Sequence, residues 1–478
     1  MKWLIAAPEI FYLFGSLCFL AWSLAAGRSG DAEGGREKRA AIGLAALGAA
    51  VCLASVWSDG HLFIKAFRAD LFTQVFKVLL SAGLLLVTFI CGDAPDVREG
   101  SRRDFYALLF LCTLAMMLLV SADHLLALYV SLELSSYSLY ILVALRREER
   151  FGIEAGLKYF FIGSFASAIM LFGFALIYSG TQTIYLSEFA PKLPELIANP
   201  VIILGLVLAL GGLFFKLAIF PFHFWAADAY QGAANPVAAY IATASKVAAI
   251  AVLLRMVSSV GQGSAYIRDV LAALAIISMT VGNLAAIAQR DVKRMLAFST
   301  VAHSGYVLLG VVAMGPAGYA SAIFYAVALL VMKFTVFLVV AETAPDGRNV
   351  QIKDLAALHR RSPILALALL VSLFSLAGVP PTIGFTGKFL IFIAAVDKGM
   401  LSLVLIAMIN VVISLYYYLL VIRAAYLLEP ATPLPPVQTS SFIKGLAGSL
   451  VAVIVIAGFY PNGLIELAET AARVLLRS

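Results

Sequence analysis

The stretch GGLFFKLAIFPFHFW, residues 211–225, is mostly apolar but carries Lys216 near its middle and Pro221 shortly afterwards. Proline removes a backbone donor and glycine loosens a helix, so this stretch predicts a helix that is broken inside a hydrophobic layer. The stretch PPTIGFTGKFLIF, residues 380–392, repeats the pattern around Lys388. Paired broken helices in the two halves of a chain are typical of an ion site near the middle of a membrane.

The composition of the whole chain favours a membrane protein. Of its 478 residues, 62% are hydrophobic and 13% charged, whereas soluble domains have about 45–50% and about 25%. This excludes a water-soluble enzyme, a disordered chain and a nucleic-acid binder, although the net charge is +7. The four cysteines are far apart in apolar runs and form no CxxC pair, so we expect buried thiols and no zinc or iron–sulfur site.

Hydropathy and breaker residues predict an all-α, polytopic membrane protein with about fourteen spanning helices. The seventh and twelfth are the two that we expect to be broken. The first is too long for the core of a signal peptide, so we expect it to be retained. A proline-rich connection at 430–439 is expected to be stiff. The expected helices cover residues 3–26, 40–57, 71–91, 104–121, 123–145, 156–180, 201–225, 236–256, 268–288, 294–314, 318–341, 363–396, 400–427 and 443–463.

Basic residues in the connections predict the orientation of the chain. They gather after odd-numbered helices, with clusters at 36–39, 102–103, 146–150, 290–294 and 348–361. Lysine and arginine accumulate in loops on the cytoplasmic side of a membrane. We therefore expect both termini on the periplasmic side of a bacterial inner membrane.

Four charged residues lie at the centres of expected helices, namely Glu133, Lys216, Lys246 and Lys388. A charge at the bilayer centre costs about 2.5–3.5 kcal/mol, and these side chains are too central to reach the surface. Because lysines outnumber acids in the helix centres, ion pairs cannot neutralise them all. A lysine without a counterion in hydrocarbon gives up its proton more readily than one in water. These four residues therefore predict a proton path.

Two histidines fit such a path. His223 lies seven residues after Lys216, two helical turns on and nominally on the same face, although Pro221 intervenes. His303 lies among hydroxyl side chains in STVAHSGY, residues 299–306, where it could relay protons or be a hydrogen-bonded structural residue. Both alternatives stay open for His303.

Four further charged residues are less central. Lys333 could serve transport or pair with an acid that the sequence does not reveal. Lys77 lies close enough to a helix end that we expect its amine to reach the membrane surface. Asp228 and Glu154 lie near helix ends, where they could load protons or have no special role.

Motifs for bond chemistry are absent. The sequence has no GxGxxG after a strand, no Walker A, no HExxH and no nucleophile elbow. We therefore expect this chain to move an ion without a catalytic, cofactor-binding or metal site of its own. Its energy would then come from a gradient or from a partner protein.

Three segments resemble the antiporter-like subunits of respiratory complex I, the proton-pumping NADH:quinone oxidoreductase. They are GLKYFFIGSFASAIMLFGFALIYSGTQT at 156–183, FFKLAIFPFHFWAADAYQGA at 214–233 and LFSLAGVPPTIGFTGKF at 373–389. The resemblance covers nearly the whole chain. It implies one membrane domain with helices 1–3 at 1–91, two inverted five-helix repeats at 104–256 and 268–427, and a last helix at 443–463.

The same resemblance implies roles for individual residues. Glu133 would pair with Lys216 and tune its proton affinity, Lys246 would bridge to the second half-channel with help from His223, and Lys388 would be the exit lysine. Lys158 matches a family lysine at the start of the sixth helix. Within the family, one sister subunit has a long C-terminal extension and another has a glutamate at the position of Lys388. This chain has neither feature, so within the family it is most similar to the third antiporter-like subunit.

The resemblance also implies the setting in which the chain works. Electrons would pass from NADH through FMN and iron–sulfur clusters to quinone, such as ubiquinone, in other subunits, and this chain would translocate protons. Its partners would be a neighbouring antiporter-like subunit, the small membrane subunits and lipid, with no nucleic acid. Three alternatives stay open: a subunit of a multisubunit cation/proton antiporter or membrane-bound hydrogenase, a stand-alone secondary transporter, and a purely structural subunit.

Overall fold

The computed structural model describes residues 5–26, 34–91, 97, 99–146, 150–196, 199–260, 265–430 and 434–476. Within these residues, 12 helices are long and apolar enough to cross a membrane. The predicted all-α, multi-pass architecture is therefore confirmed. The expected segments 40–57 and 363–396 are not among the 12, so the number of about fourteen crossings stays a prediction.

The N-terminal part of the chain begins with helices that match the expected segments closely. The charged residues at 36–39, which we expected in a loop, belong to the start of the second helix, and it therefore begins before residue 40. The helices are α1 (Ala7–Ala26), α2 (Gly34–Ala54), α3 (Leu71–Ile90), α4 (Arg102–Ser121), α5 (Leu125–Ala144) and α6 (Arg150–Thr181).

Short elements connect these helices at their ends. An antiparallel hairpin of β1 (Gly60–Leu62) and β2 (Phe67–Ala69) joins α2 to α3. Its strands are too short to give a periodic signal, and the sequence did not predict it. The other short elements are η2 (Glu99–Ser101), α7 (Leu186–Phe189), η3 (Ala190–Lys192) and α8 (Leu193–Leu196).

The predicted interruption of the seventh segment is visible as two helices, α9 (Pro200–Leu217) and α10 (Phe224–Gly232). The eighth segment is also interrupted, which we did not predict. Its parts are α11 (Asn235–Ala242) and α12 (Ala244–Val260), and Thr243 between them has non-helical angles, φ −115° and ψ −88°. Almost all of α11 and α12 is buried, so this second interruption lies inside the protein.

The C-terminal part repeats the arrangement of long helices with one interruption. Its twelfth segment is divided into α17 (Pro363–Ala377) and α18 (Ile383–Asp397). The other elements are α13 (Ala265–Ile287), α14 (Val292–Val312), α15 (Pro316–Thr343), η4 (Ile352–Leu355), α16 (Leu358–Arg361), α19 (Leu401–Leu427) and α20 (Ser441–Phe459).

A final helix, α21 (Asn462–Leu476), lies beyond the last expected segment. It buries Ala468, Ala471 and Leu475 and exposes Glu469 and Arg473. Its polar face lowers its hydropathy, which is why a search for spanning helices missed it. It packs on α15 and α3.

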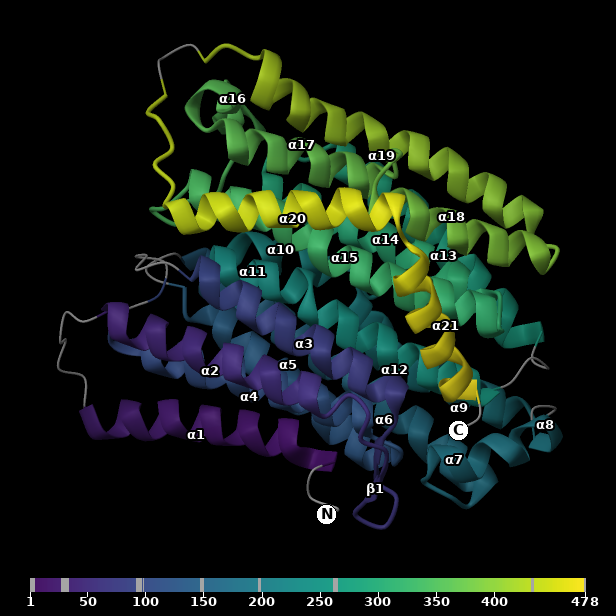
Figure 1. Cartoon of the computed structure of the whole chain (residues 1–478). Helices are drawn as coiled ribbons and strands as arrows, with labels where there is room; N and C mark the ends of the chain where they lie inside the picture. The colour runs from purple at the N-terminus through teal and green to yellow at the C-terminus, as the bar shows by residue number, and fades with distance from the viewer. Residues whose placement is uncertain are drawn as a thin grey trace.

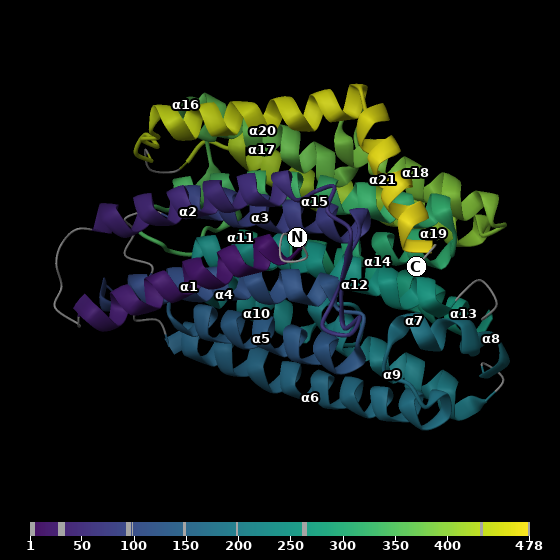
Figure 2. The same ribbon diagram turned by 60° about the horizontal axis from the view of Figure 1, so that its bottom comes forward.

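The helices lie side by side from α1 at one edge to α19 at the opposite edge, and α21 turns across the face toward the viewer in Figure 1. Turning the molecule shows α6 along another edge, far from α20 (Figure 2). Helix α15 contacts α11, α12, α14, α17, α18, α20 and α21. Because α12, α14 and α15 are apolar on all sides and almost wholly buried, they form the core that positions the internal charges.

Candidate functional site

The interruption between α9 and α10 begins at a left-handed residue. Ala218 has φ 57° and ends α9, and its backbone N–H donates to Phe214 O and Phe215 O. The backbone N–H of Ile219 donates to Phe214 O at 2.8 Å. Phe215 O accepts from Trp225 Nε1 at 3.0 Å. Both carbonyls are thus satisfied by the segment that follows the break.

The two remaining carbonyls of α9 are satisfied by side chains from other helices. Lys246 Nζ, on α12, donates to the backbone O of Lys216. Ser304 Oγ, on α14, donates to Leu217 O at 2.6 Å. The negative end of the α9 helix dipole therefore faces a lysine ammonium, which also lies 4.7 Å from the ring centre of Trp225.

At the interruption between α17 and α18, a lysine amine again donates to carbonyls at the end of a helix, but the lysine is a different one. Gly378, at φ 89°, ends α17, and its N–H returns to Phe374 O at 2.9 Å and Ser375 O at 3.0 Å. Lys388 Nζ donates to Leu376 O at 2.8 Å and Ala377 O at 3.0 Å. In both breaks a buried lysine therefore holds carbonyls at the end of a half-helix.

Lys216 lies one residue before the end of α9 and is almost wholly buried. Its Nζ donates to Ser135 Oγ at 2.6 Å and Ser136 Oγ at 3.2 Å, both on α5. Glu133, also on α5, instead accepts a hydrogen bond from Ser167 Oγ on α6. Within the described residues, no ion pair within 4.0 Å joins Lys216 to Glu133. The expected pair is thus not in direct contact in this structure, because Lys216 Nζ donates to the two serines and Glu133 accepts from Ser167.

A continuous set of side-chain contacts runs between α14, α15 and α19. Lys333 Nζ donates to Ser299 Oγ, which also accepts from Tyr418 OH at 2.9 Å. Tyr418 OH lies 3.1 Å from His303 Nε2, and Tyr325 OH lies 2.7 Å from His303 Nδ1. Both ring nitrogens of His303 therefore contact hydroxyls, the arrangement that a relay needs.

The partners of Lys333 are a hydroxyl and a backbone carbonyl, that of Leu296 at 3.1 Å. In the part of the chain that the structure describes, no acidic side chain lies within ion-pair distance of Lys333. The alternative of a hidden acidic partner within this chain is therefore not supported by the geometry.

His223 lies in the break between α9 and α10 and is 4% exposed. Its ring lies beside Phe220 and Phe224, and among the described residues its Nδ1 has no hydrogen-bond partner. No hydrogen bond between described residues joins it to Lys216 or Lys246. The expectation of a shared helical face was wrong because α9 ends at Leu217, so the intervening residues do not follow helical spacing.

Lys158, Glu154 and Asp228 meet at the edge of the bundle. Lys158 Nζ lies 2.7 Å from Glu154 Oε1 and 2.9 Å from Asp228 Oδ2. Asp228 Oδ1 also pairs with Arg294 at 2.6 Å. This cluster ties α6, α10 and α14 together, and its partial exposure leaves it accessible to water.

Lys77 does not reach a surface, and the prediction that it would was wrong. Its Nζ lies 2.7 Å from Glu9 Oε1, with the two side chains 0% and 6% exposed. The partner comes from α1, which the local sequence around Lys77 cannot reveal. This pair gives Lys77 a structural role in joining α1 to α3.

A second internal ion pair lies where α3 begins. Asp70 caps the helix by accepting from Thr73 N at 2.7 Å, and it pairs with Arg68 at 2.8 Å and with buried Arg255 at 3.6 Å. Burial alone would raise the pKa of Asp70, but Arg255, the Thr73 hydrogen bonds and Arg68 together hold it below its usual value.

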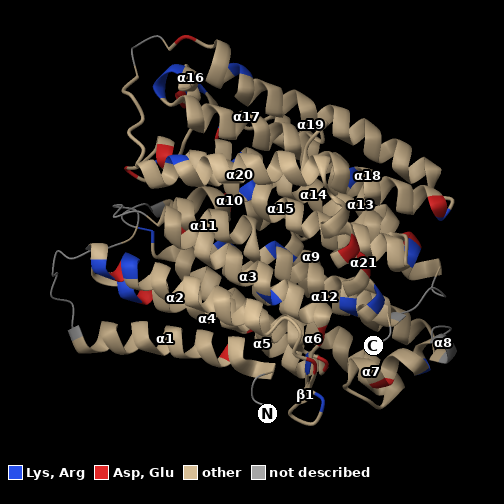
Figure 3. Cartoon of the chain, in the orientation of Figure 1, with Lys and Arg blue, Asp and Glu red and all other residues tan. Residues whose placement is uncertain are grey.

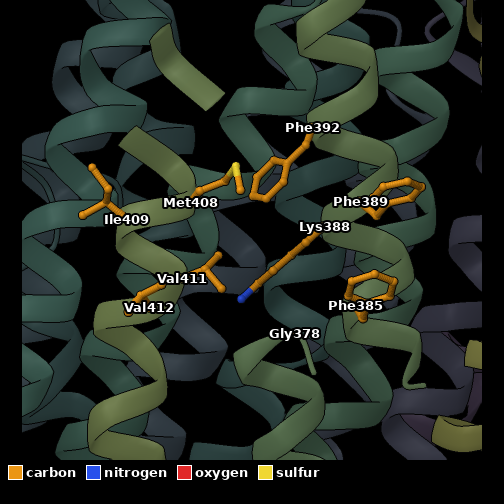
Figure 4. A pocket seen from close by; sticks show the side chains of 9 residues that line it. All are labelled: Gly378, Phe385, Lys388, Phe389, Phe392, Met408, Ile409, Val411 and Val412. Carbon is orange, nitrogen blue, oxygen red and sulfur yellow. The ribbon is translucent and has the colours of Figure 1, made fainter. Parts of the chain in front are cut away.

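Lys388 also lies at the base of a cavity of about 420 Å³ between α18 and α19, shown in Figure 4. Apolar side chains form its wall, among them Phe385, Phe389 and Val412. Lys388 itself is only 3% exposed, and its Nζ lies 4.6 Å from the ring centre of Tyr306. The amine is therefore almost wholly buried, although the cavity beside it is lined by residues on the outer surface, with Phe389 51% and Val412 69% exposed.

The structure thus links the predicted residues through groups that the sequence did not single out. Lys246 Nζ contacts the backbone carbonyl of Lys216, and Ser304 ties the same break to the helix that carries His303. Figure 3 shows basic residues inside the bundle as well as at the helix ends. The linking groups that we missed are Ser135, Ser136, Trp225, Tyr325 and Tyr418.

Comparison with known proteins gives a consistent result. The family model described as "NADH:quinone oxidoreductase/Mrp antiporter, TM" matches residues 122–414. The chain is 61% identical over 476 residues, 100% of each chain, to NADH-quinone oxidoreductase subunit N 2 of Syntrophobacter fumaroxidans. It is 36% identical to NADH-quinone oxidoreductase subunit N of Nitrosomonas europaea, over 98% of this chain and 97% of that one.

Solved structures agree on the fold. A chain of respiratory complex I from Thermus thermophilus with bound aureothin superposes with a TM-score of 0.83 at 32% identity, covering 97% of this chain and 99% of that chain. A chain of the Mrp complex from Dietzia sp. DQ12-45-1b superposes with a TM-score of 0.88, covering 100% and 98%. At 23% identity, the second likeness concerns the fold alone.

Proposed function

The chain belongs to the family of NADH-quinone oxidoreductase subunit N, and from that membership we propose that it is a proton-translocating membrane subunit of such a complex. The observation that carries the proposal is the set of lysines, hydroxyls and one histidine that lie in separate hydrogen-bonded groups within the buried core. Neighbouring antiporter-like and small membrane subunits, together with lipid, are its partners. The complex is an oxidoreductase, and this chain supplies its translocating part.

The proton path begins at the pair of α5 and α9. A negative charge near a lysine favours its protonated form, so Glu133 controls how firmly Lys216 holds its proton. When Glu133 moves or is neutralised, the proton leaves Lys216 toward Lys246, which already donates to the Lys216 carbonyl. Lys158, Glu154 and Asp228 lie at the edge of the bundle, where they exchange protons with water.

The second half of the path uses the contacts around His303. Lys333, Ser299 and Tyr418 lead to His303, and Lys388 is the exit lysine. Several buried hydroxyls have no protein partner among the described residues: those of Tyr140, Tyr159, Tyr230, Tyr306, Ser164 and Ser245. Buried polar groups of this kind are the usual positions of ordered water in proteins, and water closes the gaps between side chains in this path.

The redox chemistry takes place in other subunits. NADH, FMN, iron–sulfur clusters and quinone are bound there, and this chain binds none of them. Among the described residues, no group of three or more His, Cys, Asp or Glu side chains could hold a metal. Charge changes at the redox subunits reach Glu133 through neighbouring membrane subunits and bias Lys216.

The orientation follows from the charged loops. Basic residues gather where α2 begins and around α16, at the same end of the bundle in Figure 3. That end faces the cytoplasm of a bacterial inner membrane, and both termini lie on the periplasmic side.

The test is the Lys216→Ala variant of the intact complex in reconstituted vesicles. We expect assembly and NADH oxidation to persist while proton uptake per NADH falls strongly. Lys398→Ala, at an exposed position with no ion pair among the described residues, is the matched control and keeps normal uptake. Normal uptake in Lys216→Ala would remove this lysine from the path.

A purification test addresses the partners. We expect the chain, extracted gently from its native membrane, to copurify with flavin and iron–sulfur subunits. Recovery with only a small set of antiporter subunits would instead place it in a cation/proton antiporter.

A further inference from the structure

A second cavity, of about 620 Å³, lies where α13 and α19 end and η4 begins, and none of its lining residues belongs to the proton path. Three basic side chains line it: Arg290, Lys353 and Arg423. Each is exposed at its own position, and each comes from a different segment of the chain. The fold therefore brings three cations to one cavity that no local sequence pattern predicts.

Of the residues that the structure describes, no acidic one lines this cavity. Among the described residues, none of the three cations forms an ion pair. Three acids lie nearby and each has a partner: Asp291 accepts from Gln351 Nε2 at 3.3 Å, Asp354 accepts from Gln351 N at 2.9 Å, and Glu429 pairs with Arg360 at 2.9 Å. Like charges around one cavity repel each other unless an anion lies between them. The cavity is thus complementary to a ligand with more than one negative charge.

Two glutamines, Gln289 and Gln351, also line the cavity, and the remaining lining residues are apolar. Ile287 belongs to the end of α13, and Leu420 and Leu428 lie at the end of α19. The outward face of α19 continues this apolar surface through Tyr416 and Val412, which are 55% and 69% exposed. A soluble anion would use only the basic side chains, whereas a lipid uses both the charges and the apolar track.

We propose that this cavity binds the headgroup of an anionic phospholipid, preferably one with two phosphates, with its acyl chains along α19. Basic pockets between helices at the membrane surface bind such headgroups. Arginine forms bidentate hydrogen bonds to phosphate, and Arg290 and Arg423 supply two guanidinium groups. Lys353 adds a third charge from η4.

The experiment measures lipid binding to the purified complex by native mass spectrometry, with cardiolipin, phosphatidylglycerol, phosphatidylethanolamine and free pyrophosphate as separate probes. The test variant carries Arg290→Gln, Lys353→Gln and Arg423→Gln. The control carries Lys65→Gln, Lys398→Gln and Lys444→Gln, an equal loss of exposed charge away from the cavity. A third variant, Arg290→Lys, Lys353→Arg and Arg423→Lys, retains every charge.

We expect cardiolipin to bind the test variant about 100-fold more weakly than the wild type, from three charges near a membrane surface. The control should bind like the wild type, and the charge-retaining variant within a few fold of it. Equal cardiolipin binding by the test variant would overturn the proposal. So would equal binding of phosphatidylethanolamine or pyrophosphate by the wild type, or a crosslink from position 353 that captures another subunit in place of lipid.

Discussion

Replacing Lys388 by methionine separates its role in the helix break from its role in proton transfer. The side chain keeps its length and loses its donors, so the carbonyls of Leu376 and Ala377 lose their partner. The other two terminal carbonyls of α17 keep theirs, because the N–H groups of Gly378 and Val379 supply them. The damage is therefore confined to two buried acceptors.

The expected decrease in the free energy of unfolding follows from these two carbonyl oxygens. A buried carbonyl without a partner costs about 1–3 kcal/mol, which gives about 2–6 kcal/mol for the pair. Methionine recovers part of this loss, since the energy needed to bury an ammonium disappears and the apolar cavity beside position 388 accepts a thioether. We expect a net decrease of about 2–4 kcal/mol in the free energy of unfolding.

The assay is unfolding of the purified chain in mixed micelles of dodecyl maltoside and increasing dodecyl sulfate, followed by far-ultraviolet circular dichroism. Lys444→Met is the control, since Lys444 is exposed near the start of α20, and should change stability by less than about 0.5 kcal/mol. Lys216→Met should lie close to this control, because Lys216 donates only to the hydroxyls of Ser135 and Ser136. If Lys388→Met unfolds together with Lys444→Met, the carbonyls of α17 do not depend on this lysine.

Two further predictions concern packing and pH. Gly384→Ala should destabilise the fold by about 1–3 kcal/mol in the same assay, since its Cβ would overlap the carbonyl oxygen of Ser375. Gly445→Ala is the control: it has open space around it and should raise stability by about 0.5–1 kcal/mol. Equal effects of the two substitutions would refute this account. The lowered pKa of Asp70 means that its stabilising contribution is complete above the unfolded pKa of about 3.9 and is lost as the pH falls through the folded value. Asp70→Asn should therefore flatten the fall of the melting temperature below about pH 4, and should cost about 3–5 kcal/mol at pH 7 by leaving Arg255 without its carboxylate partner. An unchanged acid profile would contradict this account.

The helix breaks could be predicted from sequence because proline and glycine act on the backbone locally. Pro221 and Gly378 lie at interruptions that the structure shows. The interruption at Thr243 carries no such residue, so no local pattern in the sequence predicted it. Likewise, α21 escaped prediction because an amphipathic helix has the hydropathy of a surface segment.

The candidate residues could be predicted, but their partners could not. A charge in an apolar run is visible in sequence, whereas the carbonyl that Lys246 contacts and the acid that Lys77 contacts come from helices far away in the chain. For His223, the error lay in the local structure that we assumed and not in a missing partner. We applied helical spacing across a segment that the same sequence predicted to be broken, and the structure places His223 beyond the end of α9.

Both interruptions place a lysine on the carbonyl end of a half-helix, and this links proton transfer to the shape of the break. A protonated Lys388 offers three donors and a charge to the negative end of α17, whereas a neutral amine offers fewer donors and no charge. Loss of the proton therefore weakens the contact that holds the end of α17. By reciprocity, any movement that separates α17 from Lys388 makes that proton easier to lose. If the proposed function holds, a small displacement at a break is sufficient to release a proton, and coupling between subunits needs only to reach the broken helices.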